Sequence, residues 1–315
     1  MKIVFMGTPE PAAGILQDLI RAGHQVLLVV TQPDRPRGRG QKVTFSPVKE
    51  AALKHSLPVE QPEKLKGNEG LVSRIGSLSP DVIVVVAYGR ILPKAILVLP
   101  GRGCLNVHAS LLPKYRGAAP IQWALLNGEK ETGVTVMRVD ELLDTGDIIL
   151  QEKMVIEEDD DAVTLSKKLF ARGSGLLLKA LAQIEQGAAR YIPQKGSEAT
   201  HAPAIAKESG EIDWKRSARQ IHDRVRALVS WPVAHTFYRE KPLRILRTDA
   251  NVVDLESEYV QPGTIVHIVK KAGFVVKTGG GHLLIKEVQP AAKKRMGAFD
   301  FVIGHDVKIG ETLPS

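Results

Sequence analysis

Apolar, β-branched runs alternate with helical patterns along the first half of this 315-residue chain. The runs KIVFMG, QVLLVVT and DVIVVVAYG are almost entirely apolar, which is typical of strands that helices cover on both faces. Each run is followed by residues with helical spacing, and this order is the signature of successive β-α-β units. We therefore predict an α/β fold built on a doubly wound, Rossmann-like, mainly parallel sheet.

The same alternation continues as far as residue 187. Further strands are expected at residues 104–108, 132–140 and 146–156, and further helices at residues 119–128 and 162–187. In open α/β sheets, ligands bind at the edge where the strands reach their carboxyl ends. We expect this edge to carry Gly7, Thr31, Tyr88 and His108.

A different pattern follows residue 187. Residues 189–206 are polar, contain two prolines, and are predicted to form a linker. Beyond them, a helical pattern at residues 217–229 precedes short strands separated by Pro, Gly and charged turns, which is the spacing of a small barrel or sandwich. A chain of this length usually forms two domains. We predict a catalytic domain at residues 1–188 and a C-terminal antiparallel, OB-like β-barrel domain at residues 207–315.

Composition limits the compartment and the partners of the protein. Cys104 is the only cysteine, which excludes an internal disulfide framework and a thiolate metal cage and fits a reducing compartment. No apolar run approaches the roughly 20 residues of a membrane span. The net charge of +8 permits a polyanionic partner, and residues 207–315 hold 18 basic against 13 acidic side chains. We expect a cytoplasmic monomer that contacts no membrane.

Two polar side chains stand at the end of the strand predicted at residues 104–108. Asn106 and His108 are two residues apart, so they share a face of the strand, with Cα atoms about 6.5 to 7 Å apart. An Asn amide can donate hydrogen bonds to a developing oxyanion, and an imidazole can donate to that oxygen or exchange protons near neutral pH. The pair suits acyl-group transfer. The plain alternative is a strand end whose polar side chains satisfy local backbone groups.

Asp144 lies in the loop between two predicted strands, where a carboxylate can approach the same edge of the sheet. On its own, this residue is typical of a turn before Thr-Gly. Beside Asn106 and His108 it can orient the imidazole or a bridging water, and it can relay a proton from an attacking amine. The sequence leaves these roles open.

The order of these groups resembles the active-site pattern of folate-dependent formyltransferases. The segment LNVHASLLPKYRGAAPIQWALLNGEKETGVTVM carries Asn106, His108 and the turn Ser110-Leu111-Leu112-Pro113, and LDTGDI carries Asp144. With FMGTPEPAA, TQPDRPRGRGQKVTFSPVKEAA, VVVAYGRILP and QPAAKKRM, the resemblance covers nearly the whole chain. It implies transfer of a formyl group from 10-formyltetrahydrofolate to a primary amine. Within the family, the chain most resembles the members that formylate methionyl initiator tRNA.

The resemblance implies a role for each of these segments. The implied residues are, for catalysis, Asn106, His108 and Asp144; for folate, Ser110, Leu111, Leu112, Pro113, Arg90, Ile91 and Leu92; and for tRNA, Arg39. The charge of the two basic segments adds, as further tRNA contacts, Arg37, Arg35, Lys293, Lys294 and Arg295. The plain alternative for these segments is a solvated surface. A cationic loop rich in Gly and Pro can follow a phosphate backbone, which suits the segment PDRPRGRG. No metal is required. Gly7-Thr8-Pro9 stands where a dinucleotide-binding fold has G-x-G-x-x-G, so NAD is not expected.

Two other classes of function remain open. A formyltransferase for a small amine, such as glycinamide ribonucleotide or a nucleotide amino-sugar, would share the three catalytic groups but would not need the arginine loop or the C-terminal domain. A noncatalytic RNA-binding protein on this fold would be expected to have lost a reacting group, and none is lost here. The departures from the family at Ala109, where glycine is usual, and at Glu141 remove no reacting group.

Overall fold

The computed structural model describes residues 1–37, 42–252 and 260–314. The chain divides into two compact units. The first unit consists of residues 1–120, 131–156 and 166–203, and the second consists of residues 121–130, 157–165 and 204–315. The domain limits predicted from the sequence stay predictions.

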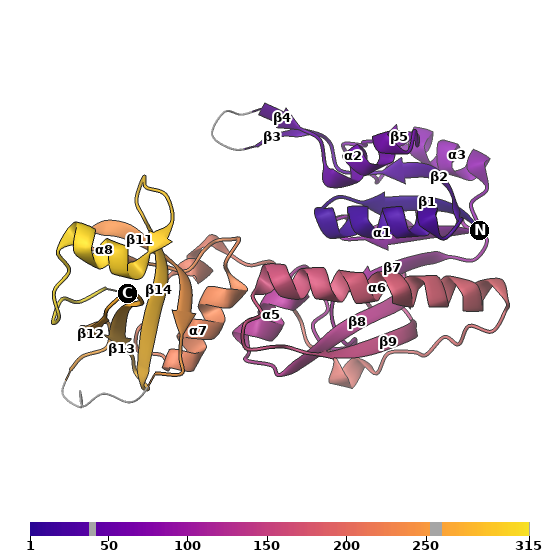
Figure 1. Ribbon diagram of the computed structural model, residues 1–315. Coiled ribbons are helices and arrows are strands. Elements are labelled where there is room, and N and C mark those ends of the chain that lie inside the picture. The colour runs from indigo at the N-terminus through magenta and orange to yellow at the C-terminus, as the bar shows by residue number, and fades with distance from the viewer. Residues whose placement is uncertain (38–41, 253–259, 315) are drawn as a thin grey trace. The chain divides into compact units, whose positions relative to one another are not determined.

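The first unit is built on a sheet with seven strands among the described residues (Figure 1). The strand order is β5-β2-β1-β6-β7-β8-β9. These strands are β1 (Lys2–Gly7), β2 (Gln25–Val30), β5 (Val59–Glu60), β6 (Val82–Val86), β7 (Cys104–His108), β8 (Glu131–Arg138) and β9 (Ile148–Val155). Neighbours from β5 to β7 are parallel, whereas the β7–β8 and β8–β9 pairs are antiparallel. The predicted Rossmann-like, mainly parallel sheet is confirmed.

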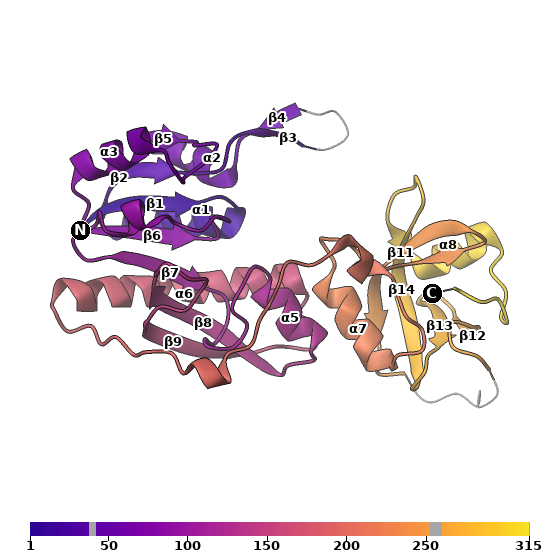
Figure 2. The same ribbon diagram turned by 180° about the vertical axis from the view of Figure 1, so that it is seen from behind.

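Helices cover both faces of this sheet (Figures 1 and 2). They are α1 (Glu10–Arg21), α2 (Pro47–Lys54), α3 (Glu69–Leu78), α4 (Lys94–Leu97) and most of α6 (Ala162–Glu185). Leu71 and Ile75 of α3 and Ile96 of α4 share one apolar core with alternate residues of the strands. On the other face lie α1 and α6, which Figure 1 shows in front of the sheet. The sequence did not predict α3.

A short hairpin projects beyond β2 (Figure 1). It is formed by β3 (Arg35–Arg37) and β4 (Lys42–Thr44), which pair antiparallel. Its base is held by Lys49, which forms an ion pair with Asp34 and donates to Gln61 Oε1 at 2.7 Å. Gln61 in turn donates to Asp34 Oδ1 at 2.8 Å. The predicted cationic loop is therefore anchored at its root to α2.

The second unit contains an antiparallel sheet in the order β10-β11-β14-β13-β12, with β15 beside β14. Its elements are α5 (Pro120–Leu126), the 3₁₀ helix η2 (Lys207–Gly210), α7 (Ala218–Ala227), β10 (His235–Tyr238), β11 (Lys241–Asp249), β12 (Ile265–Val269), β13 (Gly273–Lys277), β14 (His282–Pro290), β15 (Met296–Gly297) and α8 (Ala298–His305). The helix α7 begins at a capping box, in which Ser217 and Gln220 each bond the other's backbone N–H. Its residues Ile221 and Val225 pack into the core of the sheet. The unit is consistent with the predicted small barrel, and α8 was not predicted.

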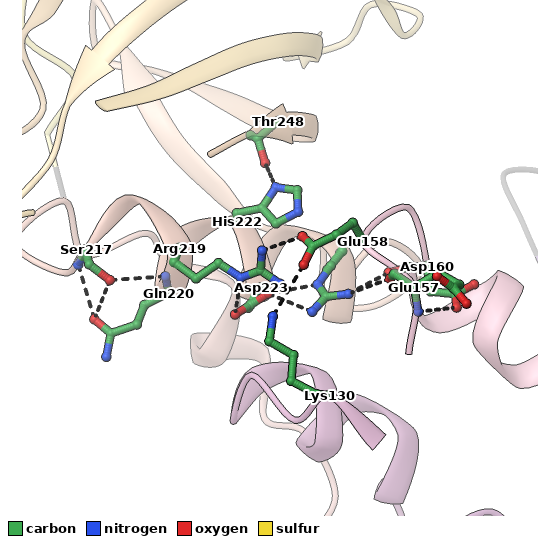
Figure 3. A network of polar contacts seen from close by, with 11 residues as sticks. Lys130, Glu157, Glu158, Asp160, Ser217, Arg219, Gln220, His222, Asp223 and Thr248 are labelled. Carbon is green, nitrogen blue, oxygen red and sulfur yellow. Dashed lines mark hydrogen bonds and ion pairs between the residues drawn. The ribbon is translucent and has the colours of Figure 1, made fainter. Parts of the chain in front are cut away.

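A polar network joins α7 to a segment that lies far earlier in the chain (Figure 3). Arg226 and Asp223 form a buried ion pair at 2.8 Å, with side chains 7% and 4% exposed. Arg226 also donates to the backbone oxygens of Glu157 at 3.3 Å and Asp160 at 3.2 Å. Arg219 completes the cluster through its Nε, which lies 3.2 Å from Asp223 Oδ2. Both buried charges therefore have partners, as burial requires.

Glu158 extends this network toward the surface (Figure 3). It forms ion pairs with Arg219 and, at 3.3 Å, with Lys130. The hydrogen bond from Arg219 is the main reason why the pKa of Glu158 falls to about 2. The segments 121–130 and 157–165 are thus joined to α7 within one unit.

Candidate active site

The strand β7 carries Asn106 and His108 to the carboxyl edge of the sheet. Cys104, on the same face of the strand, lies in the core that α3 and α4 cover. Val107 points to the opposite face, toward α6. Its Cγ1 lies so close to Gly173 of α6 that a Cβ added to this glycine would be only 2.7 Å away. Asn106 and His108 therefore project from the face opposite α6. His108 is buried and Asn106 is half-buried.

The imidazole of His108 is hydrogen-bonded at Nε2 and faces a carboxylate with Nδ1. Its Nε2 lies 2.9 Å from the backbone oxygen of Tyr115. A carbonyl oxygen can only accept, so Nε2 carries the hydrogen of this bond. Its Nδ1 lies 3.6 Å from Asp144 Oδ2. The ring orientation is therefore set before any substrate binds.

Asp144 reaches the strand from the loop between β8 and β9. Its Oδ2 accepts the backbone N–H of Gly117 at 2.9 Å, and its Oδ1 lies 3.5 Å from Asn106 Nδ2. Asp144 has φ of +54°, in the left-handed region. The structure thus brings the three predicted catalytic side chains, Asn106, His108 and Asp144, together in the first unit.

The loop that follows β7 packs against residues 192–202, which we call the strap. Arg116 donates its backbone N–H to Thr200 at 2.8 Å and accepts from the N–H of Ala202 at 2.7 Å. Gly117 has φ of +125°, and a Cβ there would lie 2.6 Å from the Ala202 oxygen. Only glycine fits this position without strain. The strap lies within the predicted linker and belongs to the first unit.

The Ser-Leu-Leu-Pro turn after β7 is fixed by two side chains of the antiparallel edge. Thr135 of β8 donates to the Ser110 oxygen at 2.6 Å and accepts the N–H of Leu112 at 3.2 Å. Gln151 of β9 donates to the Leu112 oxygen at 2.7 Å. The side chains of Ser110 and Leu112 are buried, whereas Leu111 and Pro113 are half-buried. The turn can therefore offer a ligand its backbone and two apolar side chains.

The predicted folate residues Arg90, Ile91 and Leu92 lie in the loop that follows β6, the strand beside β7. Arg90 is held by three oxygen acceptors: Gln32 Oε1 at 3.1 Å, the Pro62 backbone oxygen at 3.2 Å and the Glu63 backbone oxygen at 2.5 Å. Ile91 is 65% exposed and Leu92 is buried. This short segment therefore presents an apolar side chain beside a fixed guanidinium.

A cavity of about 680 Å³ opens beyond the carboxyl ends of β1, β2 and β6. The residues that line it are Thr8, Pro9, Gln32, Pro33, Arg35, Thr44, Ser46, Ala87, Tyr88, Gly89 and Arg90. The chain leaves β1 for β2 on one side and returns to β6 on the other, and such a switch point is where open α/β sheets bind ligands. The three side chains predicted to be catalytic are not among these lining residues. The cavity is therefore separate from the cluster that they form.

The predicted tRNA contacts fall in both units. Arg39 lies outside the described residues. Arg35 and Arg37 belong to β3, and Arg35 is exposed and lines the cavity. The remaining three are exposed between β14 and β15 of the second unit: Lys293, Lys294 and Arg295. Arg295 is engaged by Glu287 in a two-point ion pair, with Nη2 to Oε2 at 2.6 Å.

Sequence reasoning missed two polar residues of this site, Arg116 and Gln194. Gln194 lies on the strap, and its Oε1 accepts from Nε and Nη2 of Arg116 at 3.1 and 2.8 Å. Its Nε2 donates to the backbone oxygens of Asp144 at 2.9 Å and Gly146 at 2.7 Å. These partners are 48 to 78 residues away in the chain, so no local pattern signals them.

The described residues contain no group of three or more His, Cys, Asp or Glu that could hold a metal ion. They also include no helix whose length and apolar character would let it cross a membrane. Burial raises the pKa of the Cys104 thiol to about 12, so it stays protonated near neutral pH.

A family model described as formyl transferase matches residues 1–181, and one described as formyl transferase, C-terminal domain, matches residues 204–306. The chain belongs to the formyl transferase family. A curated relative from Caldanaerobacter subterraneus subsp. tengcongensis, named methionyl-tRNA formyltransferase, is 50% identical to it. That similarity covers 99% of this chain and 100% of the relative.

Solved structures share the fold. HypX from Aquifex aeolicus, solved in complex with tetrahydrofolic acid, has a TM-score of 0.64 at 18% identity. The match covers 96% of this chain and 47% of HypX. Phosphoribosylglycinamide formyltransferase from Bacillus halodurans has a TM-score of 0.51 at 27% identity, covering 60% of this chain and 97% of that protein. WlaRD, a sugar 3N-formyl transferase, has a TM-score of 0.62 at 19% identity, covering 93% of this chain and 99% of that protein. The extent of the structural match therefore does not separate one acceptor from another.

Proposed function

We propose that the protein transfers a formyl group from 10-formyltetrahydrofolate to the α-amino group of methionyl initiator tRNA and so supports the initiation of translation. The convergence of Asn106, His108 and Asp144 in a formyl transferase fold carries this proposal. The similarity to a protein named methionyl-tRNA formyltransferase extends through both matched domains and supports the acceptor.

The reaction makes two demands on the site. The amine nitrogen forms a bond to the formyl carbon, the bond from that carbon to N10 of the folate breaks, and the proton lost by the amine must end on N10. An arylamine-type nitrogen leaves poorly as an anion, so it needs this proton. The formyl oxygen meanwhile develops negative charge and needs hydrogen-bond donors. Asn106 supplies an amide N–H. His108 supplies a proton from Nε2 when the substrate takes the place of the Tyr115 oxygen as the partner of that nitrogen.

Asp144 supports this chemistry through its charge. Its Oδ2 faces Nδ1 of His108 at 3.6 Å, so it orients the ring and stabilises the imidazolium form. The attacking amine needs only modest help, because α-amino groups have a reference pKa of roughly 7.7 to 8.0. An appreciable fraction is therefore neutral near pH 7. Asp144 then has one proton to relay, directly or through a water.

The folate side of the site is proposed to lie along the ends of β6 and β7. Ile91, which is 65% exposed, offers an apolar surface to a flat ring. The turn at Ser110 to Pro113 offers backbone groups whose positions Thr135 and Gln151 hold. Leu92 is buried and would support the pocket from below.

The RNA side is proposed to use charge. The loop with Arg35, Arg37 and Arg39 would contact phosphates of the acceptor stem, and the segment 293–295 of the second unit would contact others. Residues 207–315 carry a net charge of +5, which suits a polyanion. Binding of tRNA should therefore weaken with salt, whereas folate binding should not follow the same slope.

We further propose that the protein acts as a monomer in the cytoplasm. The three catalytic side chains come from one unit of one chain, so the site needs no residue from a second copy. Its single cysteine is free and buried, which suits a reducing compartment.

A comparison of three acceptors, each assayed separately, tests the proposal. The protein is offered 10-formyltetrahydrofolate with methionyl initiator tRNA, with glycinamide ribonucleotide or with a nucleotide amino-sugar. The Asn106→Ala/His108→Ala double variant, purified in parallel, controls for a contaminating host enzyme. We expect formylation of the tRNA alone. A higher kcat/KM for either small amine would overturn the acceptor, and no turnover with any of them would overturn the activity.

A further inference from the structure

The amide of Gln194 connects two loops that meet at the catalytic cluster. It donates to the backbone oxygens of Asp144 and Gly146, and it accepts two hydrogen bonds from the guanidinium of Arg116. All four bonds lie between 2.7 and 3.1 Å. The side chain therefore uses both of its N–H groups and both lone pairs of its oxygen. Such a fully used amide fixes the distance between the loops that it joins.

The loop that carries Asp144 depends on hydrogen bonds for its shape. Leu142 and Leu143 at its tip are 69% and 54% exposed, so apolar packing holds this part of the loop weakly. Asp144 itself has a left-handed φ of +54°, a conformation that a non-glycine residue keeps only when its surroundings impose it. Thr145 donates to the Asp140 carboxylate at 2.8 Å and secures one side. Gln194 secures the other side at the Asp144 carbonyl.

The placement of the Asp144 carboxylate leaves little room for movement. It lies 3.5 Å from Asn106 Nδ2, at the outer limit of hydrogen bonding, and 3.6 Å from His108 Nδ1, just beyond that limit. Its firm bond, at 2.9 Å, is to the N–H of Gly117. Gly117 directly follows Arg116, which Gln194 also holds. The side chain of Gln194 therefore holds both partners of the bond between Asp144 and Gly117. It holds Asp144 through the backbone oxygen of that residue, and it holds Gly117 through the neighbouring Arg116.

We propose that Gln194 is a positioning residue for the reaction and acts through Asp144, an inference that rests on the proposed function of that carboxylate. Gln194 touches no reacting atom. Its effect is to keep the carboxylate aimed at His108 while the amine and the folate exchange the formyl group.

Two variants separate this role from a general contribution to the fold. Gln194→Glu keeps an acceptor for Arg116 but replaces the N–H donors with a charged oxygen that faces the carbonyls of Asp144 and Gly146. Gln194→Ala removes both sets of bonds. The matched control is Lys195→Ala, because Lys195 is the next residue on the strap and its side chain is 77% exposed.

We expect Gln194→Glu and Gln194→Ala to lower kcat by about 10- to 100-fold, since small displacements of catalytic groups have effects of this size. The KM values for tRNA and folate should change little, and Lys195→Ala should match the wild type. In an Asp144→Asn background, adding Gln194→Glu should cause almost no further loss, because the two residues act in series.

Three results would overturn the inference. One is a loss from Gln194→Glu that multiplies with the loss from Asp144→Asn, which would show an independent role. The second is unchanged kcat in both Gln194 variants. The third is a joint fall of melting temperature and folate affinity in both variants, which would mark Gln194 as structural. These single and double variants form a double-mutant cycle, which is measured with whichever amine the wild type formylates. If methionyl-tRNA is not the acceptor, the wild-type assay alone shows it, and the role of Gln194 is still tested.

Discussion

Replacement of Asp144 by Asn removes one negative charge from the catalytic cluster with almost no change of volume. At the 3.6 Å that separates Asp144 Oδ2 from His108 Nδ1, two unit charges interact by roughly 4 to 5 kcal/mol at an effective dielectric constant near 20. The imidazolium forms only in part during the reaction, and Asp144 is 12% exposed, so we expect a loss of about 3 to 4 kcal/mol. At about 1.36 kcal/mol per tenfold, kcat should fall by about 100- to 1,000-fold.

The assay is single-turnover formylation of methionyl-tRNA at saturating folate. An Asn oxygen can still accept the N–H of Gly117, so folate affinity and melting temperature should stay near those of the wild type. The control is Glu141→Gln, which removes the same charge from the same loop but from an exposed pair with Lys94 at 3.0 Å. Equal turnover in Asp144→Asn, Glu141→Gln and the wild type would refute the electrostatic role of Asp144.

Other substitutions test separate parts of the molecule. Asn106→Ala and His108→Ala should each lower kcat by about 100-fold or more in the same assay, with folding preserved as judged by circular dichroism. Arg39→Ala should raise KM for tRNA without changing folate affinity; equal damage to both, measured by tRNA kinetics and folate titration, would place Arg39 in the folate pocket or in the fold. Asp223→Leu should destabilise the protein by about 3 to 5 kcal/mol in urea unfolding, because it leaves the Arg226 charge buried without its main partner.

The central strands were predictable because their apolar runs are buried on both faces, as in β6, where all five residues are buried. The helix α3 was not, because Leu71 and Ile75 are its only buried residues and two glycines interrupt its pattern. The antiparallel direction of β8 and β9 could not be predicted from the sequence either. Strand direction depends on which neighbours pair, and local periodicity carries no information about that choice.

The candidate site divides in the same way. Asn106 and His108 share a strand, so their spacing alone predicts a common face. Asp144 was predicted from its residue type and from the family resemblance. Its approach to His108 depends on the tertiary fold and could not be predicted from its position in the sequence. Gln194 lies in a polar, proline-containing stretch that predicts a linker, and its partners are distant in the chain. Such contacts become visible only once the backbone is placed.

The second unit has a consequence for chimeric proteins. Arg219 and Arg226 of α7 depend on a stretch around Glu158 that precedes them by about sixty residues, a separation of 61 positions for the Arg219 pair. An exchange of residues 204–315 between two relatives would therefore set one parent's Arg219 against the other parent's side chain at position 158. The acceptors of Arg226 are backbone oxygens, so they would depend only on the course of the chain. An exchange meant to move the whole second unit must carry residues 121–130 and 157–165 as well. Moving these three segments together requires five junctions, after residues 120, 130, 156, 165 and 203, in place of a single junction after residue 203.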